Sequence, residues 1–406
     1  MKFEMKHYQK RIAAAFAGLL LLLASAVGHP MDSVEVSLLT CSPGTEVWAH
    51  YGHTAVRWHD RTPGGQDLVF NYGLFSTAVP HFEIRFILGL TDYRLGGETF
   101  EEFRAQYANE GRGVVEQVLD ITPADKEAIA VALRDNLRPE NIVYRYNFFY
   151  DNCTTRARDL LVGSLHGRVS YPPARQEKSS FRAMIHEWNS GYPWAQAGED
   201  ALLGIAADCA TSKAQQQFLP DHLRADFAAA RYDGRPLVRE TRRVLAPQIS
   251  ADANSAPPLL SLLLSPLACA LALAVVAGGV LAWEWRKGRK CWAWDLTLMM
   301  VAGIVGLLLA VMVFSQHPCV RVNLLLLIFN PLPLIFAWRA VRRVRQGRPD
   351  GFWRVWGVLI ALGLVGGFFQ HYPPAIVVVA LILLCNCVAH QLPRLGGGGR
   401  NATIGK

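Results

Sequence analysis

The sequence predicts an α+β domain outside the cytoplasm, followed by a C-terminal α-helical transmembrane bundle. Three observations predict this: the first residues have signal-peptide character, ordinary globular composition continues to about residue 244, and the chain is strongly apolar from residue 259. We therefore expect, along the 406 residues, a signal peptide (1–26), an extracytoplasmic domain (27–244), a linker (245–258), a five-helix transmembrane domain (259–391) and a cytoplasmic tail (392–406).

The first residues contain the three regions of a secretory signal. Four basic residues lie within the first eleven, an apolar run occupies residues 12–27, and the small residues Ala24, Ser25 and Ala26 form a cleavage pattern. The alternative is a signal anchor that is not cleaved. Either segment would carry the following domain out of the cytoplasm.

Five apolar runs follow the linker, at residues 259–283, 296–314, 322–338, 355–369 and 376–390. A helix crosses a bilayer with about 20 apolar residues, and the third run is interrupted by Asn330 and Pro331. Basic residues cluster after the first, third and fifth runs, and positive loops stay in the cytoplasm. Five spans therefore keep the N-terminal domain outside the inner membrane. Because these loops supply much of the net charge of +8, we expect no nucleic-acid partner.

Short-range patterns predict the elements of the extracytoplasmic domain. Alternation of apolar and polar residues predicts strands at residues 33–39, 52–60, 68–75 and 113–121. A helix begins at Thr122 and Pro123, which suit the N-cap and the first helical position, and it runs to about residue 136. Helical spacing recurs at residues 153–165 and 181–191. Antiparallel strands with a few helices make this domain α+β.

Cys153 is the candidate nucleophile because it opens a predicted helix. Asp151 or Asn152 can cap that helix, and its free N–H groups and dipole stabilise a thiolate. His53, in the strand at residues 52–60, can accept the thiol proton. Asn71, on the next strand of the same hairpin, can orient the imidazole. The predicted catalytic residues are therefore Cys153, His53 and Asn71.

Other interpretations of the same residues stay open. In an oxidising compartment, Cys153 can instead form a disulfide with Cys41 or Cys209, and Asn71 can be an ordinary hairpin residue. An aromatic run at residues 144–150 suits either core packing or an acyl-binding groove. No carboxylate cluster accompanies the nearby histidines, so neither a metal nor another cofactor is expected.

Four motifs in the first domain resemble the Lnb family: LLTCSPG (38–44), YGHTAVR (51–57), FNYGLF (70–75) and NFFYDNCTTR (147–156). The resemblance covers residues 34–223, and it extends more loosely to His317, Asn323, Asn330, Pro331 and Leu332 in the membrane part. The family has an exported N-terminal domain and a membrane C-terminus, and it is associated with N-acylation of bacterial lipoproteins. The chain is therefore expected to lie in the inner membrane with a periplasmic catalytic domain.

The order of the candidate residues has a second resemblance. A His on an early strand, followed by Asn-Cys at a helix start, resembles permuted papain-like (NlpC-type) proteins, including lecithin–retinol acyltransferases. Some of those proteins orient the catalytic His with a second His, whereas Asn71 is the nearest candidate here. Chain order matters little, because the geometry of nucleophile, base and orienting group decides reactivity.

The resemblance implies a lipoprotein N-acyltransferase with a Cys thioester intermediate. Cys153 would take an acyl chain from a phospholipid and pass it to the N-terminal amine of a diacylglyceryl lipoprotein. The expected substrate-binding residues are Arg156, Arg158, Asn152 and Tyr72, although both arginines can equally form a solvated helix face. The alternatives are a phospholipase or cell-wall amidase with the same dyad, and a non-enzymatic membrane protein with a structural disulfide.

Overall fold

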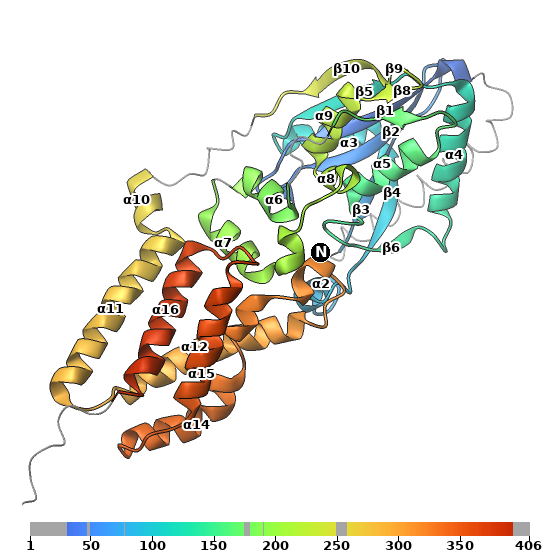
Figure 1. Cartoon of the computed structure of the whole chain (residues 1–406). Helices are drawn as coiled ribbons and strands as arrows, with labels where there is room; N and C mark the ends of the chain where they lie inside the picture. Colours follow the sequence, from blue (N-terminus) through green and yellow to red (C-terminus); the bar gives the residue numbers. More distant parts are fainter. Residues whose placement is uncertain are drawn as a thin grey trace, which may run out of the picture. The chain divides into compact units, whose positions relative to one another are not determined.

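The computed structural model describes residues 31–46, 49–76, 78–173, 179–189, 191–248 and 258–392. The predicted signal peptide, most of the linker and all but one residue of the tail lie outside this set. The chain forms two compact units: Met1–Phe181 with Ala210–Ala253, and Arg182–Cys209 with Asn254–Lys406 (Figure 1). The first is a mixed α/β domain and the second a helical bundle, which confirms the predicted fold class.

An antiparallel sheet forms the centre of the first unit. Among the described residues, seven strands pair in the order β10-β5-β1-β2-β3-β4-β6. Their bounds are β1 Val34–Cys41, β2 His53–Asp60, β3 Asp67–Leu74, β4 Asp92–Thr99, β5 Val114–Leu119, β6 Val143–Arg145 and β10 Val238–Leu245. The predicted strands correspond to β1, β2, β3 and β5. A small sheet contains β7 Val169–Ser170, β8 Arg231–Tyr232 and β9 Arg235–Pro236.

Helices cover both faces of the large sheet. The helices of this unit are α2 Phe82–Ile87, α3 Phe100–Asn109, α4 Pro123–Leu137, α5 Cys153–Gly163, α8 Lys213–Gln216 and α9 Pro220–Ala229, with a 3-10 turn, η1, at Met31–Ser33. Residues of α4, α5 and α9 pack with Val36 and Val56 in one core cluster, whereas α3 packs with Leu39 and Ala55 in another. Because β1 lies between the two clusters, all eight of its residues are buried.

Local chemistry sets the start of α4 as the sequence predicts. Thr122 is the N-cap and Pro123 the first helical residue. The Thr122 hydroxyl accepts a hydrogen bond from the N–H of Asp125, and the Asp125 carboxylate accepts one from the N–H of Thr122. This reciprocal pair satisfies two donors that a helix start otherwise leaves unpaired.

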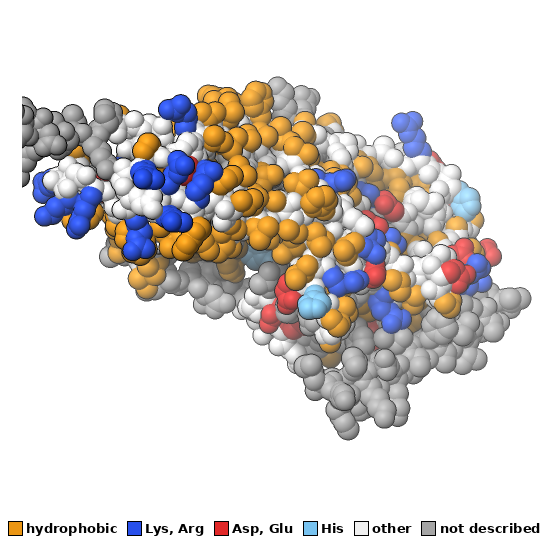
Figure 2. Space-filling model, turned by 90° about the horizontal axis from the view of Figure 1, so that it is seen from below, with side chains coloured by type: hydrophobic (Ala, Val, Ile, Leu, Met, Phe, Trp, Pro, Cys, Tyr) orange, Lys and Arg blue, Asp and Glu red, His pale blue; other side chains and the backbone are white. Residues whose placement is uncertain are grey.

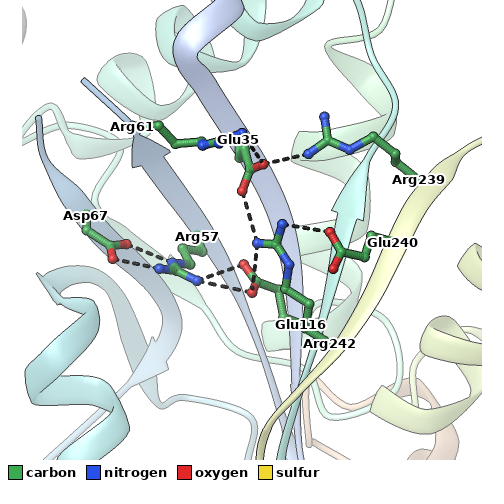
Figure 3. Close-up of polar contacts among 8 residues, drawn as sticks. All are labelled: Glu35, Arg57, Arg61, Asp67, Glu116, Arg239, Glu240 and Arg242. Carbon is green, nitrogen blue, oxygen red and sulfur yellow. Dashed lines mark hydrogen bonds and ion pairs between the residues drawn. The ribbon is translucent and has the colours of Figure 1, made fainter. Parts of the chain in front are cut away.

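A network of charged side chains crosses five strands of the sheet (Figure 3). Arg57 of β2 donates to Asp67 of β3 at 2.7 Å and to Glu116 of β5 at 2.9 Å, and its guanidinium lies 3.4 Å from the ring centre of Phe100. Glu35 of β1 accepts hydrogen bonds from two arginines of β10. Because Glu35, Arg57 and Glu116 are buried, each charge depends on its partners.

The second unit contains the apolar helices. They are α10 Pro258–Leu263, α11 Pro266–Lys287, α12 Trp292–Met312, α13 Pro318–Arg321, α14 Leu332–Arg345, α15 Phe352–Gly366 and α16 Pro374–Ala389, with a 3-10 turn, η4, at Leu324–Leu327. Three segments are long and apolar enough to cross a membrane, at Pro266–Lys287, Trp292–Met312 and Pro318–Arg345, and α15 and α16 are shorter apolar helices. Figure 2 shows an extensive apolar surface with Lys and Arg gathered at one end. The last turns of α11 and α14 both carry basic residues.

The third apolar run is a broken helix. Asn330 and Pro331 separate η4 from α14, and the backbone of Asn330 lies against Gly306 of α12. A Cβ at Gly306 would approach the Asn330 carbonyl carbon to 2.3 Å, so only glycine fits this crossing. Small residues allow such close backbone packing between membrane helices.

The segment Arg182–Cys209 packs with this bundle, which the sequence did not indicate. It contains most of α6 Phe181–Asn189, α7 Pro193–Leu202 and a 3-10 turn, η3, at Ile205–Asp208. The Gly204 N–H donates to the Cys319 carbonyl at 2.7 Å, and the side chains of Asn323 and Gln370 donate to backbone carbonyls of the segment. Those residues lie at the ends of spans that the charge pattern predicts to face outside. The predicted domain limits remain predictions.

Replacing Arg57 by Met should destabilise the protein, because the buried Glu116 would lose its hydrogen-bonded cation and keep only Arg242, 3.8 Å away. Removing one member of a buried ion pair costs roughly 3–5 kcal/mol. We expect a clear fall in the thermal unfolding midpoint of the full-length protein in detergent. In the control, Arg61→Met, the midpoint should change little, because the Arg61 side chain is 62% exposed and Glu35 keeps Arg239 and Arg242. Equal midpoints for the two variants would contradict this role of the network.

Candidate active site

The sulfur of Cys153 lies at the start of α5, where Asn152 fixes the first helical turn. The Asn152 side-chain oxygen accepts hydrogen bonds from the N–H groups of Thr154 and Thr155, both at 2.9 Å. Its NH₂ group donates to the carbonyls of Phe148 and Phe218, both at 3.0 Å. The N–H of Cys153 has no acceptor among the described residues, as expected at the first helical position. Asn152, predicted to bind substrate, therefore acts here as the helix cap.

His53 and Asn71 are hydrogen-bonded, and Glu98 orients the pair. The amide NH₂ of Asn71 donates to the Glu98 carboxylate at 2.7 Å. Because a carboxylate only accepts, the Asn71 oxygen must face the imidazole, and it lies 3.0 Å from His53 Nε2. His53 Nε2 therefore carries a proton, and Nδ1 is the ring nitrogen left to accept one.

Strand register brings these three side chains together. Asn71 of β3 lies opposite Ala55 of β2, which is two residues from His53 on the same strand face. Glu98 of β4 lies opposite Val69, which is two residues from Asn71. Each contact in the chain Glu98–Asn71–His53 is therefore a diagonal cross-strand neighbour. Sequence reasoning missed Glu98, because no strand was predicted at residues 92–99.

The β2 strand also holds α5 in place. The hydroxyls of Thr54 and Thr154 lie 3.0 Å apart, and both residues are fully buried. Gly73, on the neighbouring strand, has a φ of +90°, and a Cβ there would lie 3.4 Å from the Cβ of Cys153. The positive φ favours glycine, and the missing side chain leaves space beside the cysteine. The sequence analysis assigned no role to Thr54, Thr154 or Gly73.

Neighbouring groups favour the ionised thiol. Burial would raise the pKa of Cys153, but the charge and hydrogen bond of His53, with the Thr54 N–H, lower that pKa to about 7. Burial would lower the pKa of His53, but the charge of the Cys153 thiolate raises it. The two shifts reinforce a thiolate–imidazolium pair near neutral pH.

The other cysteines show no competing chemistry at this position. All eight cysteines of the chain are free thiols, including Cys41, Cys153 and Cys209, so neither disulfide alternative is formed. Burial raises the pKa of Cys41 to about 12, which keeps that thiol protonated. Cys209 is exposed.

The remaining predicted residues have other contacts. Arg156 makes two hydrogen bonds to Asp151, at 2.5 and 2.7 Å, and its guanidinium lies over the ring of Tyr144. Arg158 donates to Asp159 and to the carbonyl of Ala214.

Tyr72 is buried, with 1% of its surface exposed, and its hydroxyl accepts a hydrogen bond from Asn136. The structure thus brings Cys153, His53 and Asn71 together, and the Tyr72 side chain contacts Asn136 and the ring of Tyr144.

Two family models match the chain. The model for the Lnb N-terminal periplasmic domain matches residues 28–182, and the model for the Lnb transmembrane domain matches residues 259–394. Comparisons with curated proteins and with solved structures gave no match. The two family matches place the first domain in the periplasm and the chain in the inner membrane, and they support a lipoprotein N-acyltransferase-like role. Together they cover most of the chain in the expected order, and the protein belongs to the Lnb family.

Proposed function

We propose that this protein is a thiol acyltransferase that moves an acyl chain from a phospholipid to the N-terminal amine of a diacylglyceryl lipoprotein. One observation carries the proposal. The Cys153 thiol, with its pKa lowered to about 7, lies beside a His53 that Asn71 orients through Nε2. This is the arrangement of an activated cysteine nucleophile with its base. Membership of the Lnb family supports a lipoprotein as the acyl acceptor and a location in the membrane.

In the first half-reaction, Cys153 becomes acylated. The thiolate sulfur bonds to the ester carbonyl carbon of the phospholipid, and the carbonyl electron pair moves onto the oxygen. That oxyanion would form near the N–H of Cys153, which has no acceptor among the described residues and can donate a hydrogen bond to it. When the carbon–oxygen ester bond breaks, the imidazolium of His53 gives its Nδ1 proton to the departing alcohol. The products are a thioester and a lysophospholipid.

In the second half-reaction, the lipoprotein amine attacks the thioester. His53, now neutral, takes a proton from the attacking nitrogen through Nδ1. The carbon–sulfur bond breaks and leaves an amide on the lipoprotein and a thiolate on Cys153. The thiolate–imidazolium pair is thereby restored without another cofactor.

The membrane bundle bears on the choice between transferase and hydrolase. Both lipid substrates reside in the bilayer, and a covalent membrane anchor raises the effective concentration of the catalytic domain around them. A cell-wall amidase would gain nothing from this anchoring. The dyad itself also supports hydrolysis, so the acceptor must be tested directly.

Incubation of the full-length protein with phosphatidylethanolamine in mixed micelles should add one acyl group to Cys153. We expect intact-mass and peptide analysis to locate the adduct, and neutral hydroxylamine to remove it, as it does thioesters. Cys153→Ala should form no adduct, whereas Cys209→Ala, which removes an exposed thiol, should form it normally. Acyl transfer by a protein whose Cys153 is never acylated would contradict the scheme, and release of free fatty acid alone would favour a phospholipase.

The alkylation of Cys153 by iodoacetamide should follow its thiolate fraction, with a midpoint near pH 7. In His53→Ala, the stabilising charge and hydrogen bond disappear while burial remains, so the midpoint should move to higher pH. Peptide mass spectrometry can follow both profiles, and exposed Cys209 serves as the internal reference. The same midpoint for Cys153 in both proteins would show that His53 does not activate the thiol.

A further inference from the structure

Tyr144 has a buried hydroxyl that the proposed chemistry has not used. Tyr144 is the middle residue of β6 and is 7% exposed, and its hydroxyl has no hydrogen-bond partner among the described residues. Leaving a buried hydroxyl unpaired costs free energy, so such a group calls for an explanation. Two other buried tyrosines of this domain are paired: the Tyr72 hydroxyl with Asn136, and the Tyr232 hydroxyl with Asp125.

This hydroxyl borders the space beside Cys153. A Cβ built on Gly73 would lie 3.4 Å from the Cβ of Cys153 and 3.9 Å from the Tyr144 hydroxyl oxygen. Apart from the flanking residues of Gly73, these are the described atoms within 4 Å of that point. One unfilled position therefore touches both the nucleophile's side chain and the unpaired hydroxyl. A group bound to the sulfur could enter it.

The ring of Tyr144 is held from two sides. The guanidinium of Arg156 lies 3.6 Å from the ring centre, and two hydrogen bonds to Asp151 fix that guanidinium. The ring of Tyr72 meets it edge-on, with centroids 6.4 Å apart. A cation on the ring face draws electron density from the phenol and makes its O–H a stronger donor.

The protonation state of Tyr144 also suits a donor. Burial and the nearby Cys153 thiolate raise the pKa of Tyr144, while Arg156 opposes them only in part. The hydroxyl therefore stays protonated across the range in which the thiol ionises. Within the described part of the chain its proton has no acceptor, so it is available when an oxyanion forms.

We propose that the Tyr144 hydroxyl, together with the N–H of Cys153, donates a hydrogen bond to the oxyanion of the tetrahedral intermediates. This inference rests on the proposed acyltransferase function and adds a catalytic residue to it. No net proton transfer occurs: the O–H bond stays intact while negative charge builds on the former carbonyl oxygen and then returns. The same two donors serve both half-reactions, because each passes through an oxyanion on the carbon attached to the sulfur. Donors fixed in advance at such a position act mainly on the transition state.

The test compares acylation with alkylation of the same sulfur in Tyr144→Phe, which keeps the ring on Arg156 and removes the hydroxyl. Acylation of Cys153 by phosphatidylethanolamine in micelles should slow by about 10²–10³-fold. Alkylation by iodoacetamide forms no oxyanion, so its rate and pH profile should stay unchanged. A residue with only a structural role, or one that tuned the thiol, would alter both reactions.

Tyr171→Phe is the matched control. The Tyr171 hydroxyl is also buried without a partner among the described residues, but the Tyr171 ring stacks on Phe227. The acylation rate of Tyr171→Phe should equal that of the parent protein. A second variant, with 3-fluorotyrosine at position 144, keeps the donor and should restore acylation to within a few-fold of the parent rate.

The outcomes separate the two proposals. Equal acylation rates for the parent protein and Tyr144→Phe would overturn this inference and leave the proposed function intact. A parallel loss of acylation and alkylation in Tyr144→Phe would also overturn it, because the hydroxyl would then act on the thiol or the fold. Failure of the parent protein to acylate would overturn the proposed function, and the inference with it.

Discussion

The side chain of Asn152 makes four hydrogen bonds that fix the first turn of α5. Two of them satisfy helix N–H groups. The other two are donated to the carbonyls of Phe148, which precedes α5 in the sequence, and Phe218, which follows it. This placement leaves the N–H of Cys153 without an acceptor among the described residues and sets the sulfur at the start of β2. The dipole of α5, the Thr54 N–H and the His53 imidazole then act on the same atom.

A second constraint runs across the sheet rather than along the helix. Glu98 fixes the orientation of the Asn71 amide, which in turn fixes the tautomer of His53. The base is thereby ready to act through Nδ1 without rearrangement of the strands. In the proposed mechanism, Asn71, with the Glu98 carboxylate behind it, has the orienting role that a second His has in some permuted papain-like proteins.

The sequence allowed the elements with local signals to be predicted. The strands β2 and β3, the Thr122 cap and the helix at Cys153 follow from alternation, capping chemistry and periodicity over a few residues. The contacts of Cys153, His53 and Asn71 were also expected, because the residue types and their motifs pointed to one chemistry.

What the sequence did not reveal depends on contacts between distant segments. Glu98 lies on a strand whose two glycines, Gly96 and Gly97, obscure its alternation, and its partner Asn71 is 27 residues away. Tyr144 belongs to an aromatic run whose composition is also typical of a hydrophobic core. Only the packing around Gly73 shows that the Tyr144 hydroxyl lies near Cys153. The association of residues 182–209 with the bundle rests on hydrogen bonds between residues far apart in the sequence, such as Gly204 with Cys319 and Gln370 with Leu203, and no local pattern signals them.

A single-turnover chase shows whether Cys153 itself carries the acyl chain to the lipoprotein amine. Protein carrying an isotopically labelled acyl chain on Cys153 would be freed of phospholipid and mixed with a synthetic diacylglyceryl lipopeptide that has a free N-terminus. We expect the label to leave Cys153 and to appear as an amide on the lipopeptide with the same rate constant. Label that stays on Cys153 while unlabelled amide accumulates, or label that emerges as free fatty acid, would contradict this expectation.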